Sequence, residues 1–250
     1  MARVLVTGAS GRLGRVVVPR LTEARHEVRA MSRTKRADAD GVTWVIADVD
    51  QRDQALDDAL QEIEVVVHLA SNRATADATD VEGTSNLLAA AEAAGVKHLL
   101  YVSIVGIDEL PLPYYQAKLA AEQAIAGSSV PSTIFRTTQL HELLSEWLVT
   151  AAGIGGGPAM IAGGTRFRPV ASSEVADRVV ALIKGGAAGR VRDLAGPETL
   201  NAPELATRHA RKTKQRVTLY PAEAGTVAAA FLGAAHLGNR CDLGTVRFGD

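Results

Sequence analysis

Residues 4–14 of this chain read Val-Leu-Val-Thr-Gly-Ala-Ser-Gly-Arg-Leu-Gly. The apolar start predicts a buried strand, and a helix-like segment follows the last glycine. Gly8, Gly11 and Gly14 are therefore expected in a turn between a strand and a helix. Such a turn brings backbone N–H groups and the positive end of a helix to a pyrophosphate, and only glycine leaves room for that approach. We interpret the stretch as a dinucleotide-binding turn rather than a surface turn that binds nothing.

Short apolar runs alternate with amphipathic segments along the first half of the chain, a pattern typical of βαβ units and a parallel sheet. Strands are expected near 3–7, 27–32, 42–47, 64–69, 98–103 and 131–136. Helices are expected between them near 12–24, 52–60, 78–94 and 114–126. Right-handed crossovers between these elements predict an α/β fold with a doubly wound, parallel Rossmann-type sheet.

The regular alternation of predicted strands and helices ends after Arg136, where glycine-rich stretches and short elements begin. The elements expected there are a strand near 191–194, a helix near 203–213, a strand near 216–219 and a helix near 222–236. This tail is too short to be a separate domain of typical size. We predict a nucleotide-binding Rossmann core over 1–136, with a helix over 173–185 returning to it, and a small C-terminal substrate-binding lobe formed by 137–172 and 190–250.

The composition and charge of the chain argue against several classes of protein. The 250 residues carry a formal net charge of −1, and no basic run exceeds three residues, which argues against a nucleic-acid-binding surface. No apolar run approaches the ~20 residues needed to span a bilayer, and the amino terminus does not resemble a signal peptide. The single Cys241 cannot form an internal disulfide. We therefore expect a cytoplasmic protein that acts on a small molecule, without a membrane or nucleic-acid partner.

The end of the second predicted strand indicates which dinucleotide binds. An NAD-preferring site needs an acidic residue there, which accepts hydrogen bonds from the ribose hydroxyls. The only acid of residues 27–33 is Glu27, at the opposite end of the strand, and Ser32 and Arg33 stand where the carboxylate is needed. A guanidinium there suits a 2′-phosphate, which Arg12 of the glycine turn could also reach. We predict NADP (NADPH) as the cofactor; the alternative is a solvated basic loop.

Further cofactor contacts are expected from the same turn and from the ends of the strands. Asp48 ends the third strand, where a short polar residue often faces the adenine edge, and Ser71 follows the fourth strand beside the expected pyrophosphate. A strand-end cap is the alternative role at both places. The other predicted cofactor-binding positions are Thr7, Gly8, Ser10, Gly11, Leu13, Gly14, Val49, Leu69 and Ala70.

Three stretches together resemble the short-chain dehydrogenase/reductase superfamily: Thr7-Gly-Ala-Ser-Gly-Arg-Leu-Gly14, Asp80-Val-Glu-Gly-Thr-Ser-Asn-Leu-Leu88 and Tyr114-Tyr-Gln-Ala-Lys118. The chain is most similar to the atypical, NmrA-like branch, which includes proteins described as sugar-nucleotide epimerases. Leu194-Ala-Gly-Pro-Glu198 also resembles this branch, so that the resemblance covers nearly the whole chain.

The resemblance implies that Tyr114 and Lys118 face the nicotinamide. Residues four apart share one face of a helix, and an ammonium beside a phenol stabilises the phenolate, so that the tyrosine exchanges a proton near neutral pH. Lys118 would also hold the nicotinamide ribose. Tyr115 is the alternative phenol, but its i+4 residue is Leu119.

Four further positions complete the predicted site. Ser103 matches the family's hydroxyl that hydrogen-bonds a substrate carbonyl. Asp80 stands where many relatives use asparagine to anchor a proton-relay water, and an ionised aspartate accepts the same hydrogen bonds but donates none. Gln139 and His141 follow the sixth strand and are candidate substrate contacts, although His141 could equally start a helix or lie at the core edge. The histidines form no metal-ligand cluster, so no metal is predicted.

The sequence as a whole predicts an NADP(H)-dependent oxidoreductase that reduces a small carbonyl, enone or quinone-like substrate. The cofactor would supply the hydride, and Tyr114 would donate the proton. Lys118 would stabilise the phenolate of Tyr114, and Ser103 would polarise the acceptor oxygen. Two alternatives stay open: a sugar-nucleotide epimerase that uses the bound cofactor transiently, and a non-catalytic NADP(H)-binding redox sensor of the NmrA type. The sensor function stays open because Asp80 stands where many relatives carry asparagine.

Overall fold

The computed structural model describes residues 1–39, 41–153, 159–162, 165–214, 217, 219–222, 233–238 and 240–250. The chain divides into two compact units. Unit 1 is formed by Met1–Ser103, Pro113–Phe135 and Ala176–Val191, and unit 2 is formed by Ile104–Leu112, Arg136–Val175 and Arg192–Asp250. Each unit is described by itself below.

The sheet of unit 1 is the parallel sheet that the sequence predicts. Its strands are β1 (Arg3–Thr7), β2 (Glu27–Ser32), β3 (Val42–Ile46), β4 (Val65–His68), β5 (His98–Ile104), β6 (Ser132–Thr137) and β9 (Gly189–Arg190), of which β5 and β6 end in unit 2. The order is β6-β5-β4-β1-β2-β3, and β1 pairs in parallel with both β2 and β4. This confirms the doubly wound Rossmann-type fold, whose strand order reverses between β1 and β4.

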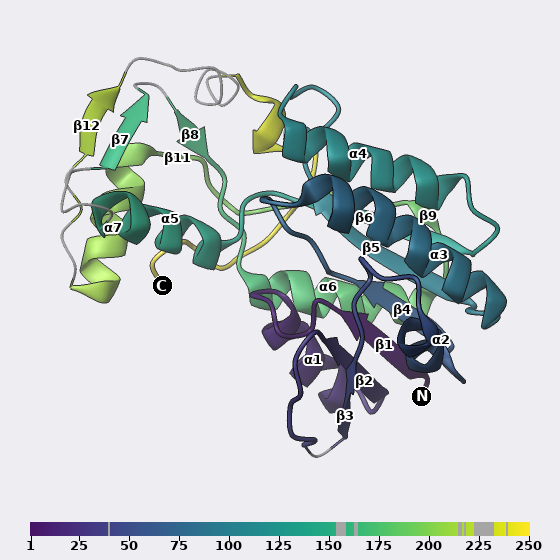
Figure 1. Cartoon of the computed structure of the whole chain (residues 1–250). Helices are drawn as coiled ribbons and strands as arrows, with labels where there is room; N and C mark the ends of the chain where they lie inside the picture. Colours follow the sequence, from purple (N-terminus) through teal and green to yellow (C-terminus); the bar gives the residue numbers. More distant parts are fainter. Residues whose placement is uncertain are drawn as a thin grey trace. The chain divides into compact units, whose positions relative to one another are not determined.

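Helices cover both faces of this sheet (Figure 1). They are α1 (Gly14–Glu23), α2 (Gln54–Leu60), α3 (Gly83–Ala93), α4 (Pro113–Ala126) and α6 (Ser172–Gly185). α1 and α6 are joined by an ion pair between Arg20 and Asp177 at 3.0 Å, and α3 packs between α2 and α4. The strands therefore have apolar neighbours on both sides, which is why β1 and β4 read as continuous apolar runs and why Leu5 and Val66 are fully buried.

The helix predicted over 78–94 differs at its start. Residues Asp77–Glu82 form a π-helical turn, and the α-helix begins only at Gly83. Two consecutive polar residues of this turn, Thr79 and Asp80, are buried. Apolar periodicity does not distinguish a π-turn from an α-turn, so the sequence could not show this difference.

Unit 2 consists of short elements. They are α5 (His141–Gly153), β7 (Ala159–Ala162), β8 (Arg166–Phe167), β10 (Leu194–Ala195), β11 (Leu200–Asn201), α7 (Ala202–Thr213), β12 (Leu219–Ala222), a 3-10 turn (Ala235–Leu237) and β13 (Asp242–Leu243). β10 pairs in parallel with Thr137 at the end of β6 and with β13, β7 pairs in parallel with β12, and β8 pairs antiparallel with β11. The strand predicted near 191–194 is replaced by β9 and β10. Most of the helix predicted over 222–236, and the start of the strand predicted near 216–219, lie outside the described residues.

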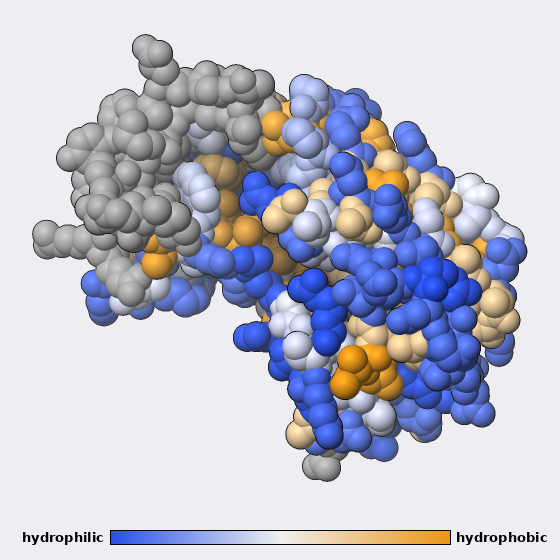
Figure 2. All heavy atoms as spheres, in the orientation of Figure 1, coloured by the Kyte–Doolittle hydropathy of each residue, from blue (hydrophilic) through white to orange (hydrophobic). Residues whose placement is uncertain are grey.

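The visible surface of unit 1 is mostly hydrophilic, with small separate hydrophobic patches (Figure 2). Large hydrophobic side chains are exposed at few of the described positions, namely Met1, Ile46, Val149, Leu243 and Val246. Within the described part of the chain, no helix has the length and apolar character needed to cross a membrane.

Candidate functional site

The glycine turn of unit 1 has the geometry of an anion cradle. Gly8 has a φ of +64°, and a Cβ there would lie 2.6 Å from the carbonyl carbon of Leu69. A Cβ on Gly14 would lie 2.4 Å from the carbonyl oxygen of Gly8, while the N–H of Gly11 donates to the same oxygen at 2.9 Å. The N-cap of α1, Leu13, makes no side-chain cap, and the N–H groups of Arg15 and Val17 donate to the carbonyls of Gly11 and Leu13 within the turn. These features fit a pyrophosphate.

Gly14→Ala is expected to destabilise the protein by about 1–3 kcal/mol, because the new methyl group overlaps the backbone of the turn. Dinucleotide binding should weaken with it. The matched control is Gly185→Ala, where a Cβ meets nothing within 4 Å, and there the change should stay within about 1 kcal/mol. Urea unfolding and cofactor titration of both variants check this. A Gly14→Ala protein that matches the wild type in both measurements would contradict the proposed cradle.

A directional chain of hydrogen bonds joins the ends of β1 and β4. The hydroxyl of Thr7 accepts from the N–H groups of Leu69 and Ala70, both at 3.2 Å. Its own proton therefore goes to Nδ1 of His68, 2.7 Å away. The Thr7 side chain is fully used in this way, so a bound cofactor would meet Thr7 through its backbone.

The same chain continues on the other side of the imidazole. Nε2 of His68 carries the ring proton and donates to the hydroxyl of Thr84 at 3.1 Å, and Thr84 donates to the backbone carbonyl of Asp80 at 2.6 Å. Burial lowers the pKa of His68 to about 3, with a smaller contribution from the charge of Lys118. His68 is thus a neutral core residue that fixes the π-turn against the strand ends.

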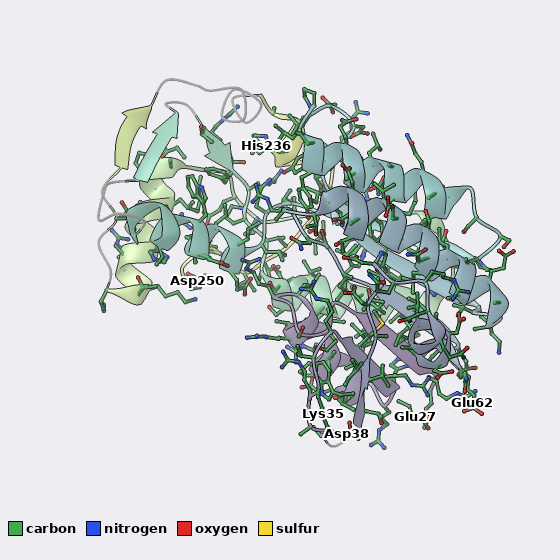
Figure 3. The ribbon with its side chains drawn as sticks, in the orientation of Figure 1. Glu27, Lys35, Asp38, Glu62, His236 and Asp250 are labelled. Atoms are coloured by element: carbon green, nitrogen blue, oxygen red, sulfur yellow. The ribbon has the colours of Figure 1, made fainter. Side chains whose placement is uncertain are left out.

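The loop after β2 presents the predicted phosphate-binding cations. The hydroxyl of Ser32 accepts from Nε of Arg36 at 3.4 Å, and the Arg36 guanidinium lies over the Trp44 ring, 5.1 Å from its centroid. Asp38 accepts a hydrogen bond from the N–H of Trp44 at 2.7 Å, so the loop is attached to β3 at two points. Arg33 precedes both attachment points and is exposed. Figure 3 labels Lys35 and Asp38 on this loop.

The remaining predicted cofactor positions of unit 1 are engaged in local contacts. Asp48 Oδ1 accepts from the N–H of Asp50 at 3.1 Å, which is the strand-end turn considered as its alternative role. Val49 is buried in the core. The carbonyl of Ser10 accepts from Nε of Arg15 at 2.9 Å, which closes the glycine turn onto α1.

Tyr114 at the start of α4 is paired with a hydroxyl. Its phenol oxygen lies 2.8 Å from Oγ of Ser71. Burial raises the pKa of Tyr114, and the Ser71 hydrogen bond and the charges of Arg73 and Arg12 only partly oppose that rise. The phenol is therefore protonated at neutral pH. The sequence predicts the opposite direction, because an ammonium next to the phenol would lower this pKa.

The Lys118 ammonium lies against a different set of groups. Its Nζ is 3.6 Å from Oδ1 of Asp80, donates to the carbonyl of Val102 at 3.3 Å and lies 4.3 Å from the centroid of the Tyr101 ring. Asp80 is fully buried, and its Oδ2 accepts from the N–H of Asn72 at 3.2 Å. Burial lowers the pKa of Lys118, and the Asp80 charge opposes this shift. The predicted catalytic lysine and aspartate thus form one buried ion pair.

Strand β5, whose Tyr101 ring contacts Lys118, also carries two buried hydroxyls. The Oγ of Ser103 and the phenol oxygen of Tyr101 have no hydrogen-bond partner in the part of the chain that is described. Buried polar groups normally have a partner, so a substrate oxygen or an internal water is the natural complement of Ser103. Among the described residues, no group of three or more His, Cys, Asp or Glu side chains could hold a metal ion.

Gln139 and His141 belong to unit 2, where their side chains contact other segments of that unit. The Gln139 amide donates to the carbonyl of His236 at 3.0 Å and accepts from the N–H of Arg168 at 3.2 Å. His141 Nε2 donates to the carbonyl of Pro169 at 3.3 Å. These contacts give both residues a structural role, and their role toward a substrate stays a prediction.

Sequence reasoning did not single out Arg73. It follows β4 in an exposed loop, and its guanidinium carbon lies 5.7 Å from the centroid of the Tyr114 ring. No motif marks this arginine, because the contact joins positions 41 residues apart and exists only once β4 and α4 are packed.

Comparisons with known proteins agree with this geometry. A family described as NAD(P)H-binding matches residues 8–184. Quinone oxidoreductase 2 of Escherichia coli (strain K12) is 28% identical over 226 residues, which cover 86% of this chain and 76% of that protein. The (4-alkanoyl-5-oxo-2,5-dihydrofuran-3-yl)methyl phosphate reductase of Streptomyces griseus is 32% identical over 207 residues, which cover 80% of this chain and 70% of that protein.

Solved structures show the same fold. A nucleoside-diphosphate-sugar epimerase from Staphylococcus aureus has a TM-score of 0.74 at 18% identity, covering 94% of this chain and 90% of that one. A short-chain dehydrogenase/reductase superfamily protein from Agrobacterium tumefaciens with bound NAD has a TM-score of 0.68 at 24% identity, covering 89% and 87%.

Proposed function

The chain belongs to the NAD(P)H-binding family, and from this membership we propose that it is an NADP(H)-dependent oxidoreductase of the short-chain dehydrogenase/reductase superfamily. Its acceptor is a small carbonyl, enone or quinone-like compound. The names of two relatives support this class of reaction, because one is a quinone oxidoreductase and the other reduces an oxo-dihydrofuran phosphate.

The segment Leu69-Ala70-Ser71 carries the proposal. Its first residue packs against the glycine turn at Gly8, and its last residue hydrogen-bonds the phenol of Tyr114. Two residues of extended chain span at most about 7 Å. A proton donor therefore lies next to the turn that would hold the pyrophosphate, at the carboxyl ends of β1 and β4, where ligands of doubly wound sheets bind.

Each proposed catalytic residue has a defined task. When bound, the reduced nicotinamide supplies a hydride to the acceptor carbon. Tyr114, which is protonated at neutral pH, donates its phenolic proton to the acceptor oxygen, and Ser71 orients that phenol. Ser103 donates a hydrogen bond to the same oxygen. Lys118, held by Asp80, supplies positive charge beneath the site.

The preference for NADP(H) rests on the loop after β2. The Ser32 hydroxyl accepts from Arg36 and can donate its own proton to a 2′-phosphate. Arg33 is exposed beside it and can bind the same phosphate with two parallel N–H groups.

Arg33→Asp is expected to weaken NADPH binding by roughly 10- to 100-fold, since a hydrogen bond to a charged group contributes about 1.5–3 kcal/mol. NADH binding should not weaken, because NADH lacks the 2′-phosphate. Arg25→Asp is the matched control: it makes the same charge change on an exposed residue after α1, with a φ of +63° that aspartate tolerates. Calorimetric titration of both cofactors measures the effect, and tighter binding of NADH than of NADPH by the wild type would refute the preference.

A second candidate function has one specific observation in its favour. Lys118 is engaged by Asp80 and Val102, and the pKa of Tyr114 is raised rather than lowered. That arrangement suits a redox sensor, which binds NADP(H) without turning over a substrate. Assays of NADPH oxidation against a panel of quinones, enones and aldehydes separate the two functions. Turnover supports the enzyme, whereas cofactor binding without turnover of any acceptor supports the sensor.

A further inference from the structure

Positive charge gathers on the solvent side of the proposed proton donor. Arg73 follows Ser71 by two residues, and its guanidinium carbon lies 5.7 Å from the centroid of the Tyr114 ring. The side chain is exposed, and in the part of the chain that the structure describes no carboxylate forms an ion pair with it. Its charge is therefore not neutralised by a neighbouring side chain there.

A second cation acts on the same phenol. The charge of Arg12, in the glycine turn, lowers the pKa of Tyr114 together with that of Arg73, although burial outweighs both. The negative charge that opposes them is that of Asp80, which is fully buried and paired with Lys118. The cation that lies over the phenol ring, Arg73, is thus exposed, whereas the carboxylate whose charge acts on the phenol is buried.

We propose that Arg73 binds an anionic substituent, a carboxylate or a phosphate monoester, on the acceptor that is reduced beside Tyr114. This inference rests on the proposed function and names the substrate class of the same site. The planar guanidinium matches both anions with two parallel hydrogen bonds. Because the guanidinium carbon lies 5.7 Å from the centroid of the Tyr114 ring, an anion bound to Arg73 would lie near that side chain.

Three aldehydes with the same reacting group test the inference: 4-formylbenzoate, its methyl ester and 4-formylphenyl phosphate. The binding constant of each for the protein–cofactor complex is measured by calorimetry, and KM is measured from NADPH oxidation. The wild type should bind at least one anionic aldehyde more tightly than the ester. Arg73→Gln should reduce that discrimination by roughly 10- to 100-fold, and Arg73→Lys should restore part of it. The phosphate and carboxylate arms show which anion is preferred.

Arg25→Gln is the control, because it removes an exposed cation elsewhere on unit 1 and should leave the discrimination unchanged. Equal binding of acid and ester by the wild type overturns the inference. So does an Arg73→Gln protein that retains the discrimination, or one whose main change is a weaker affinity for NADPH, since Arg73 would then serve the cofactor. If no aldehyde is reduced, the proposed function fails, but the binding constants still decide the role of Arg73.

Discussion

Tyr114→Phe is expected to lower kcat for carbonyl acceptors by about 10²- to 10⁴-fold, which is the usual contribution of a positioned general acid. The phenol oxygen is held 2.8 Å from the Ser71 hydroxyl, and burial keeps it protonated at neutral pH. Phenylalanine retains the ring and its packing under Arg73 but removes the proton. The rate of NADPH oxidation measures the loss, and the KM for NADPH should change little.

Tyr115→Phe is the matched control for this prediction. It removes a phenol one position further along α4, on a buried side chain whose pKa is raised to about 12 by burial. Its kcat should stay within about twofold of the wild type. A collapse in Tyr115→Phe but not in Tyr114→Phe would exchange the two roles. Full activity in both would mean that the acceptor takes a hydride without a phenolic proton.

Asp80→Asn is expected to destabilise the protein by about 3–5 kcal/mol at pH 7, the usual consequence of removing one partner of a buried ion pair. The amide keeps the shape of the side chain and can still accept from the N–H of Asn72. The substitution leaves the buried Lys118 ammonium without its counter-charge. Urea unfolding at pH 7 measures the change, and a loss below about 1 kcal/mol would show that the pair is not coupled.

The pH dependence of this variant has a defined sign. Burial already lowers the pKa of Lys118 below its unfolded value, and loss of Asp80 lowers it further. Between the folded and unfolded pKa values the unfolded chain binds more protons, so stability rises with pH across that window. The penalty of Asp80→Asn should therefore shrink in alkaline solution. The double variant Asp80→Asn with Lys118→Met, which has no charge left to desolvate, should recover most of the stability at pH 7 and lose this pH dependence.

The fold could be predicted because its signals are local. β1 and β4 are apolar runs that end in turn residues, and Gly8 to Gly14 mark the crossover that begins the sheet. The π-turn before α3 was not predictable, because one additional residue in a turn leaves the apolar pattern almost unchanged. The short strands of unit 2 were placed less well, since two-residue strands carry no periodicity.

The candidate site could be predicted only in part. The spacing of Tyr114 and Lys118 identified two polar residues of one helix, but spacing does not state which groups face them. The partner of Lys118 is Asp80, 38 positions earlier, and the partner of Tyr114 is Ser71, 43 positions earlier. Both pairs form where separate βα connections meet at the carboxyl edge of the sheet.

The sequence by itself determined the alternation of strands and helices in unit 1, the glycine turn and the basic loop after β2, because each depends on residues close together in the chain. Only the tertiary structure decided the charge state of the phenol, the burial of the Lys118–Asp80 pair and the position of Arg73 over the ring. These properties depend on solvent exclusion and on charges from distant segments. Neither exists until the sheet and helices have packed.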